Sequence, residues 1–248
     1  MCFELDSLPP VARISGAAVA HDDLELAAED GTRYAAFEAT PDDRNGVGVV
    51  ILPDVRGLYR FYEELAMRFA ERGYDAVAID YFGRTAGSAK RGGDFDYPPH
   101  VAATTQEGIQ ADIGAAVQHL RPRTRAIFTV GFCFGGRHSW LAAAAGHDLA
   151  GAVGFYGGPG ERNGQPGAIQ LASAIESPIL ALQAGDDDHI TPEDNAALDD
   201  ALTAAGVEHE VVTYDGAPHS FFDRRQSEHQ AASDDAWARV LAFIAAHA

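Results

Sequence analysis

The sequence predicts an α/β fold in which a mostly parallel β-sheet is covered by helices on both faces. Short apolar runs alternate with helix-like segments along the chain, and this order builds parallel sheets. The run at residues 47–52 is continuously apolar, as expected of a strand that is buried on both faces. A glycine-rich turn at residues 131–136 joins another apolar run to an alanine-rich segment, which is typical of a strand-to-helix connection.

The first half of the chain is predicted to begin with an antiparallel edge hairpin. Its strands are residues 24–28 and 32–39, with a turn between them. The buried strand 47–52 follows, and then a helix whose apolar residues recur at helical spacing. The remaining segments are a helix over residues 58–69 that stops at Gly73, a strand at 76–79, a loop at 83–100 and a helix from about 102 to 120.

The second half is predicted to contain four more strands, each followed by a helix or a loop. Thr191 and Pro192 form a good helix start, because threonine caps a helix and proline suits its first position. Ser227 with Gln230 resembles a capping box at the start of the last helix. The predicted strands are residues 127–130, 151–156, 179–183 and 211–214, and residues 157–167 are predicted to form a loop with no assigned chemistry.

Composition limits the classes of function. The length of 248 residues and the absence of a composition shift predict one domain over residues 1–248. The formal net charge of −19 argues against a nucleic-acid partner, since phosphate contacts need a basic surface. No apolar run is long enough for a membrane span and no secretory leader is visible, so we expect a cytoplasmic protein. Two cysteines, no zinc-like spacing and no phosphate-binding loop imply neither a metal nor a cofactor.

The segment Gly-Phe-Cys-Phe-Gly-Gly at residues 131–136 indicates a nucleophile elbow with cysteine as the nucleophile. Such a turn strains the backbone of the nucleophile, and glycines two positions before and after it remove side chains that would collide. The turn also places the sulfur of Cys133 near a helix N-terminus, which favours a thiolate. The alternative interpretation is a tight turn of another open-sheet protein, with Cys133 as a small buried apolar residue.

The downstream residues favour the catalytic interpretation. In α/β-hydrolases the nucleophile is followed by the acid and then by the histidine. Here an aspartate-rich loop and then Pro218-His219-Ser220-Phe221 follow Cys133, each after a strand-like run. We therefore predict that Cys133 attacks an acyl carbon, that His219 transfers the proton and that Asp188 orients the imidazole.

Two choices within this site are less direct. Asp186 and Asp187 compete with Asp188, which is preferred because it lies closest to the helix start at Thr191. The N–H groups of Phe134 and of Val55, which follows strand 47–52, are the predicted oxyanion donors.

These motifs resemble the dienelactone hydrolase family, also called carboxymethylenebutenolidases, over roughly residues 20–247. The elbow, the Asp-His-Ile-Thr-Pro loop at residues 188–192 and the Pro-His-Ser-Phe segment at 218–221 follow the family pattern in order and spacing. The resemblance implies the α/β-hydrolase fold and a Cys-His-Asp triad acting on lactones or related esters.

Further positions are implied by the resemblance alone. The family has an acidic residue, usually glutamate, that hydrogen-bonds the resting cysteine, and Asp54 holds that position. It also has two arginines that bind a substrate carboxylate. Arg84 aligns with the first, whereas the second falls near Arg224 or Arg225, and Arg56 is an additional arginine close to the site.

The sequence thus predicts a cofactor-free hydrolase that opens a lactone or cleaves an ester through a thioester intermediate. Its expected partner is a small lactone or ester substrate, with or without a carboxylate. A broad-specificity carboxylesterase on the same fold is one alternative. A noncatalytic ligand-binding or redox-sensing protein of the same fold is another, because fold alone does not decide function.

Overall fold

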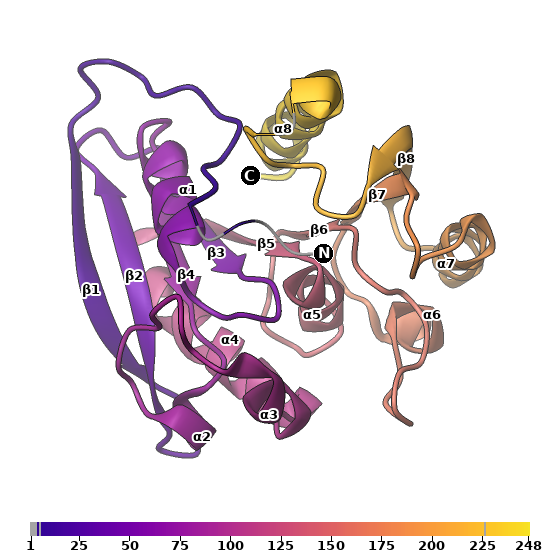
Figure 1. Cartoon of the computed structure of the whole chain (residues 1–248), viewed down its shortest axis with the longest axis horizontal. Helices are drawn as coiled ribbons and strands as arrows, with labels where there is room; N and C mark the ends of the chain where they lie inside the picture. The colour runs from indigo at the N-terminus through magenta and orange to yellow at the C-terminus, as the bar shows by residue number, and fades with distance from the viewer. Residues whose placement is uncertain (1–3, 5, 226) are drawn as a thin grey trace.

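The computed structural model describes residue 4, residues 6–225 and residues 227–248, and its centre is one eight-stranded sheet (Figure 1). The strand order is β1-β2-β4-β3-β5-β6-β7-β8. Neighbouring strands pair in parallel from β4 to β8, whereas β1 and β2 are antiparallel to their neighbours. The strands are β1 (Val19–Ala27), β2 (Arg33–Pro41), β3 (Val47–Leu52), β4 (Asp75–Ile79), β5 (Ala126–Phe132), β6 (Gly151–Phe155), β7 (Ile179–Asp186) and β8 (His209–Pro218).

This architecture is the α/β-hydrolase fold that the sequence predicted. The edge hairpin is confirmed, since β1 and β2 pair antiparallel from Val19 opposite Pro41 to Ala27 opposite Arg33. The central strand β3 is buried at every position, in agreement with its continuous apolar sequence.

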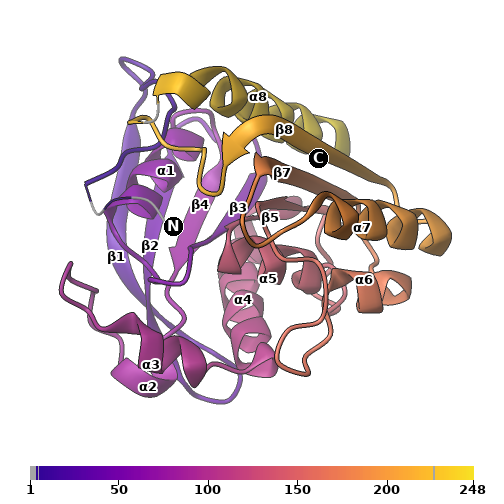
Figure 2. The ribbon, with the colours of Figure 1, turned by 45° about the vertical axis from the view of Figure 1, so that its right-hand side comes forward.

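Helices cover the sheet on both faces. On one face α1 and α8 pack against apolar side chains of the central strands, including Phe128 and Leu180. On the other face α4 packs on β3 and β4, while α5 and α7 pack on β6 and β7. Figure 2 shows β7 and β8 side by side, with α7 and α8 on opposite sides of them. The longer helices are α1 (Arg60–Ala70), α4 (Gln106–Leu120), α5 (Phe134–Ala142), α7 (Pro192–Ala205) and α8 (Gln230–His247).

The structure corrects three local predictions. The segment predicted as a loop over residues 83–100 contains the short helix α2 (Gly83–Ala86) and the start of a second one, α3 (Tyr97–Ala102). The next helix begins at Gln106 instead of 102, because the side chain of Thr105 caps it by accepting a hydrogen bond from the N–H of Gly108. The capping box predicted for the last helix is wrong, since α8 follows the 3₁₀ turn Ser227–His229 and has no side-chain cap.

The other predicted helix start is confirmed. The Oγ1 of Thr191 accepts a hydrogen bond from the N–H of Asp194, and the carboxylate of Asp194 accepts one from the N–H of Thr191. Pro192 occupies the first turn of α7. A short helix that the sequence did not predict, α6 (Ala168–Leu171), precedes β7. None of the described helices is both long and apolar enough to cross a membrane.

Candidate active site

Cys133 lies at a sharp turn between β5 and α5. Its backbone is left-handed, with φ of 55° and ψ of −111°, and its N–H donates to the carbonyl of Phe155 at 2.9 Å. A Cβ on Gly131 would lie 2.0 Å from the carbonyl oxygen of Gly135, and a Cβ on Gly135 would lie 2.1 Å from that of Leu52. Glycine is therefore required on both sides of the cysteine, as the elbow motif predicted.

The strand pair β7–β8 brings an aspartate to the histidine. The Nδ1 of His219 and the Oδ2 of Asp187 are 2.6 Å apart, and the side chain of Asp187 is fully buried. Asp188, the residue chosen from the sequence, is exposed, and the structure places Asp187 rather than Asp188 against His219. The reason is the strand register. Asp186 pairs with Pro218 after an irregularity at Ala184, which places the next residue of each strand side by side.

Hydrogen bonds hold Asp187 as a carboxylate. Burial alone would raise its pKa, but hydrogen bonds from the His219 ring and from the N–H of His189 outweigh this effect, so the pKa lies below its usual value. The N–H of His189 donates to the Oδ1 of Asp187 at 2.9 Å. One carboxylate oxygen therefore faces the imidazole and the other is fixed by the loop backbone.

A cavity of about 870 Å³ brings Cys133, His219, Val55 and Phe134 together. The two residues predicted to donate N–H groups to an oxyanion thus line the same space as the thiol and the imidazole. The ring of Tyr156 packs beside His219, with 4.9 Å between the ring centroids. Other parts of the wall come from the α3–α4 region and from the loop after β6.

Asp54 is buried, and its carboxylate is bound by neighbouring side chains. It accepts hydrogen bonds from the Nη2 of Arg56 at 2.8 Å and from the hydroxyl of Tyr59 at 3.2 Å. Burial would lower the pKa of Arg56, but Asp54 raises it above its ordinary value, which is the behaviour of a charged pair. The contact between Asp54 and the resting Cys133 that the family resemblance implies stays a prediction.

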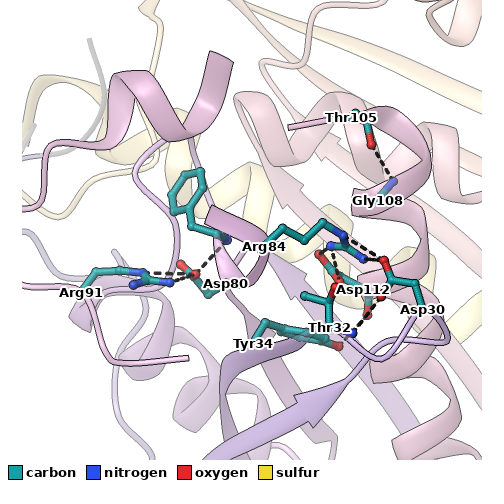
Figure 3. A network of polar contacts seen from close by, with 10 residues as sticks. Asp30, Thr32, Tyr34, Asp80, Arg84, Arg91, Thr105, Gly108 and Asp112 are labelled. Carbon is teal, nitrogen blue, oxygen red and sulfur yellow. Dashed lines mark hydrogen bonds and ion pairs between the residues drawn. The ribbon is translucent and has the colours of Figure 1, made fainter. Parts of the chain in front are cut away.

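Arg84 does not line the cavity, in contrast to the expectation that it binds substrate. Figure 3 shows its guanidinium between Asp112 and Asp30. Its Nη1 lies 2.6 Å from Asp112, whose side chain is fully buried, and its Nη2 lies 2.9 Å from Asp30. Arg84 therefore ties α2 to α4 and to the β1–β2 turn. The sequence could not show this, because Asp112 comes from a helix that folds against Arg84.

Arg224 and Arg225 also lie outside the cavity. Arg224 is exposed and its N–H donates to the carbonyl of Leu8, while Arg225 forms an ion pair with Asp6. None of the arginines that the resemblance implies as binding a substrate carboxylate therefore lines the cavity that contains Cys133.

His138 is a cavity residue that the sequence analysis missed. It lies in α5, five positions after the nucleophile, and only 5% of it is exposed. Its ring packs edge-on against Phe134, with 4.5 Å between centroids, and its Nδ1 has no hydrogen-bond partner among the described residues. Burial lowers the pKa of His138 to about 3, so the imidazole is neutral. Within the described residues, no group of three or more His, Cys, Asp or Glu side chains could hold a metal ion.

The fold and this arrangement define an α/β-hydrolase. Comparison with known proteins gives the family, because the sequence model of the dienelactone hydrolase family matches residues 34–248. A carboxymethylenebutenolidase from Rhodococcus opacus is 31% identical over 255 residues, which cover 98% of this chain and 96% of the relative. The chain therefore belongs to the dienelactone hydrolase family and is a hydrolase.

Solved structures agree with this assignment. A Klebsiella pneumoniae protein assigned as a dienelactone hydrolase has a TM-score of 0.82 and 28% identity, covering 92% of this chain and 99% of its own. A dienelactone hydrolase-like promiscuous phosphotriesterase from metagenomic libraries has a TM-score of 0.77 and 23% identity, covering 94% and 99%. The second likeness concerns the fold alone.

We expect Arg84→Ala to destabilise the protein by about 3 kcal/mol, because it leaves the buried carboxylate of Asp112 without its ion-pair partner. Burial already raises the pKa of Asp112 to about 6, so a proton relieves the unpaired group at low pH. The loss in urea-unfolding free energy should be larger at pH 8 than at pH 5. Arg225→Ala, which removes an exposed ion pair, should cost less than about 1 kcal/mol. Equal losses in the two variants would contradict the structural role of Arg84.

We expect the buried His138 to make stability fall as the pH falls. The unfolded chain takes up a proton near pH 6.5, whereas the folded chain keeps His138 neutral down to about pH 3. The unfolded state binds more protons between these values, so the wild type should lose up to about 2 kcal/mol more than His138→Gln between pH 6.5 and pH 5. Urea unfolding at both pH values measures this, and parallel losses in the two proteins would rule it out.

Proposed function

We propose that this hydrolase opens a lactone or cleaves an ester by a Cys133–His219–Asp187 triad, through a thioester intermediate and without a cofactor. The observation that carries the proposal is the 2.6 Å contact between His219 and a buried Asp187, in the same cavity as a cysteine on a left-handed elbow. Nucleophile, base and orienting acid are the three roles that acyl transfer requires. Family membership supports the same reaction class.

In the first half-reaction the Cys133 thiolate attacks the carbonyl carbon of the substrate. The carbonyl π electrons move to oxygen, and the N–H groups of Phe134 and Val55 stabilise that oxyanion. The C–O bond to the ring or alcohol oxygen then breaks, and the departing oxygen takes a proton from the His219 imidazolium. The thioester remains on Cys133.

In the second half-reaction water replaces the alcohol. His219 removes a proton from the water as it attacks the thioester carbon, and the C–S bond breaks to return the thiolate. The Asp187 carboxylate supports the imidazolium in both halves, which is consistent with its lowered pKa. Helix α5 begins at Phe134, and the positive end of its dipole stabilises the thiolate form of Cys133 between turnovers.

A broad-specificity esterase is the second candidate. The observation in its favour is that Arg84, Arg224 and Arg225 all lie outside the cavity, so the carboxylate site that the family resemblance implies is missing there. The rates for carboxymethylenebutenolide and for its neutral methyl ester distinguish a lactone hydrolase that selects a carboxylate from such an esterase.

Cys133→Ala should lower the ring-opening rate of carboxymethylenebutenolide by at least about 10⁴-fold, because the attacking atom is removed. Mass spectrometry of the wild type with a slow ester should show the mass of one acyl group, located on the peptide that contains Cys133. Unchanged turnover in Cys133→Ala would refute the mechanism. Ligand binding without turnover, or reversible oxidation of Cys133 alone, would favour the noncatalytic alternative.

The two neighbouring aspartates provide a matched pair of variants. Asp187→Asn should lower kcat by roughly 10⁴-fold, since the amide cannot support the imidazolium and favours the wrong tautomer. Asp188→Asn, one position further along the loop, should keep wild-type kcat because that side chain is exposed. Steady-state kinetics of the two purified variants decides the assignment, and the reverse result would restore Asp188 as the acid.

A further inference from the structure

The loop after β6, residues 157–167, forms part of the cavity wall and is fixed by a buried arginine. Arg137 lies in α5, four positions after Cys133, and 7% of it is exposed. Its guanidinium donates to the carbonyl groups of Gly158, Gly160, Gln165 and Pro166. No carboxylate is among these partners. Arg137 thus holds the loop against α5, the helix that begins after Cys133, and among the described residues its guanidinium is hydrogen-bonded only to backbone carbonyl groups.

The loop presents a second arginine at a defined position. Arg162 and Gln165 exchange two backbone hydrogen bonds, of 3.0 and 2.9 Å. Asn163 and Gly164 between them have φ of 53° and 74°, as in the tight hairpin turns that keep two strands in register. Both the N–H and the carbonyl group of Arg162 are therefore held by Gln165 across this small hairpin, although the side chain of Arg162 is exposed.

Arg162 is one of the residues that line the cavity, and its side chain is exposed. Within the part of the chain that the structure describes, it has no ion pair and no side-chain hydrogen bond. It also lies close enough to Arg137 for its positive charge to add to burial in lowering the pKa of Arg137. The two guanidinium groups are therefore near each other, and of these two lining arginines only Arg162 has side-chain donors without a partner among the described residues.

Among the charged residues that line the cavity, Arg162 is the one that can pair with an anionic ligand. Arg137 and Arg162 are the two arginines of the cavity lining, which contains no lysine among the described residues. Of its two acidic residues, Asp194 is occupied by the N–H and hydroxyl of Thr191 at 2.9 and 3.1 Å. Glu161, next to Arg162 in the chain, is the acid that would compete with an anionic ligand.

We propose that Arg162, on the loop that Arg137 ties to α5, determines specificity by binding an anionic group of the substrate, most simply a carboxylate remote from the reacting carbonyl. The inference rests on the proposed function, since it concerns the same cavity. A planar guanidinium can hold a carboxylate by two parallel hydrogen bonds, which a neutral methyl ester cannot accept with equal strength. In a protein with a net charge of −19, a local cation at the site also offsets the repulsion of an anionic substrate.

The first test is binding, in a protein that cannot turn over. In the Cys133→Ala background, calorimetry would measure the affinity for carboxymethylenebutenolide and for its methyl ester. Adding Arg162→Gln should weaken binding of the carboxylate by about tenfold and reduce the preference over the methyl ester by the same factor. Adding Glu161→Gln should strengthen binding of the carboxylate about twofold. Arg224→Gln, an exposed arginine outside the cavity, should change neither affinity.

The second test is the ratio of kcat/KM for the two lactones in proteins that retain Cys133. Arg162→Gln should lower that ratio about tenfold relative to the wild type, with an unchanged melting temperature because its side chain is exposed. An unchanged ratio and unchanged binding preference would overturn the role of Arg162. If the wild type turned over neither lactone, the proposed function would fail, whereas the calorimetric comparison would still decide whether Arg162 binds the anion.

Discussion

The close approach of α5 to the carboxyl ends of two central strands, β3 and β6, is the constraint on which the site depends. A Cβ on Gly136 would lie 2.6 Å from the carbonyl oxygen of Phe155 in β6, and one on Gly135 would lie 2.1 Å from that of Leu52 in β3. The helix can therefore start directly above the sheet only because glycines occupy these positions. This start forces Cys133 into the left-handed region and presents its side chain beside the first N–H groups of the helix. The strain in the backbone and the reactivity that we propose for the thiol therefore have the same origin.

The second half of the site depends on where the pairing of β7 and β8 ends. The two strands run in parallel and are irregular at Ala184, so Asp186 meets Pro218 and their successors emerge together. The imidazole and the carboxylate are then joined at 2.6 Å without a long loop between them. Because the hydrogen bonds keep Asp187 ionised despite its burial, a carboxylate faces the imidazole of His219, as the proposed mechanism requires.

Much of the fold could be predicted from the sequence, because apolar runs and turn residues act locally. The order of nucleophile, acid and histidine also predicted two loops that the structure brings together, since Asp187 and His219 meet at 2.6 Å. The residue within the acid loop could not, since three consecutive aspartates are equivalent until the register of β7 distinguishes them. The role of Arg84 depends on Asp112, and that of Arg137 on four carbonyl groups of a distant loop. Such contacts are formed by tertiary packing and leave no pattern of spacing in the chain.

Arg56, Arg84 and Arg162 differ mainly in whether a carboxylate of the protein is already paired with the guanidinium. Arg84 faces a buried carboxylate and Arg56 faces Asp54, so a substrate carboxylate would have to displace an existing partner at either position. Displacement leaves the original carboxylate buried without its charge partner, which costs more than the new pair gains. Arg162 carries no such penalty, because it stands on a fixed hairpin at the cavity and its donors face no carboxylate among the described residues. By this argument, binding an anion at Arg162, on the loop after β6, has a lower free-energy cost than binding it at Arg56 or Arg84.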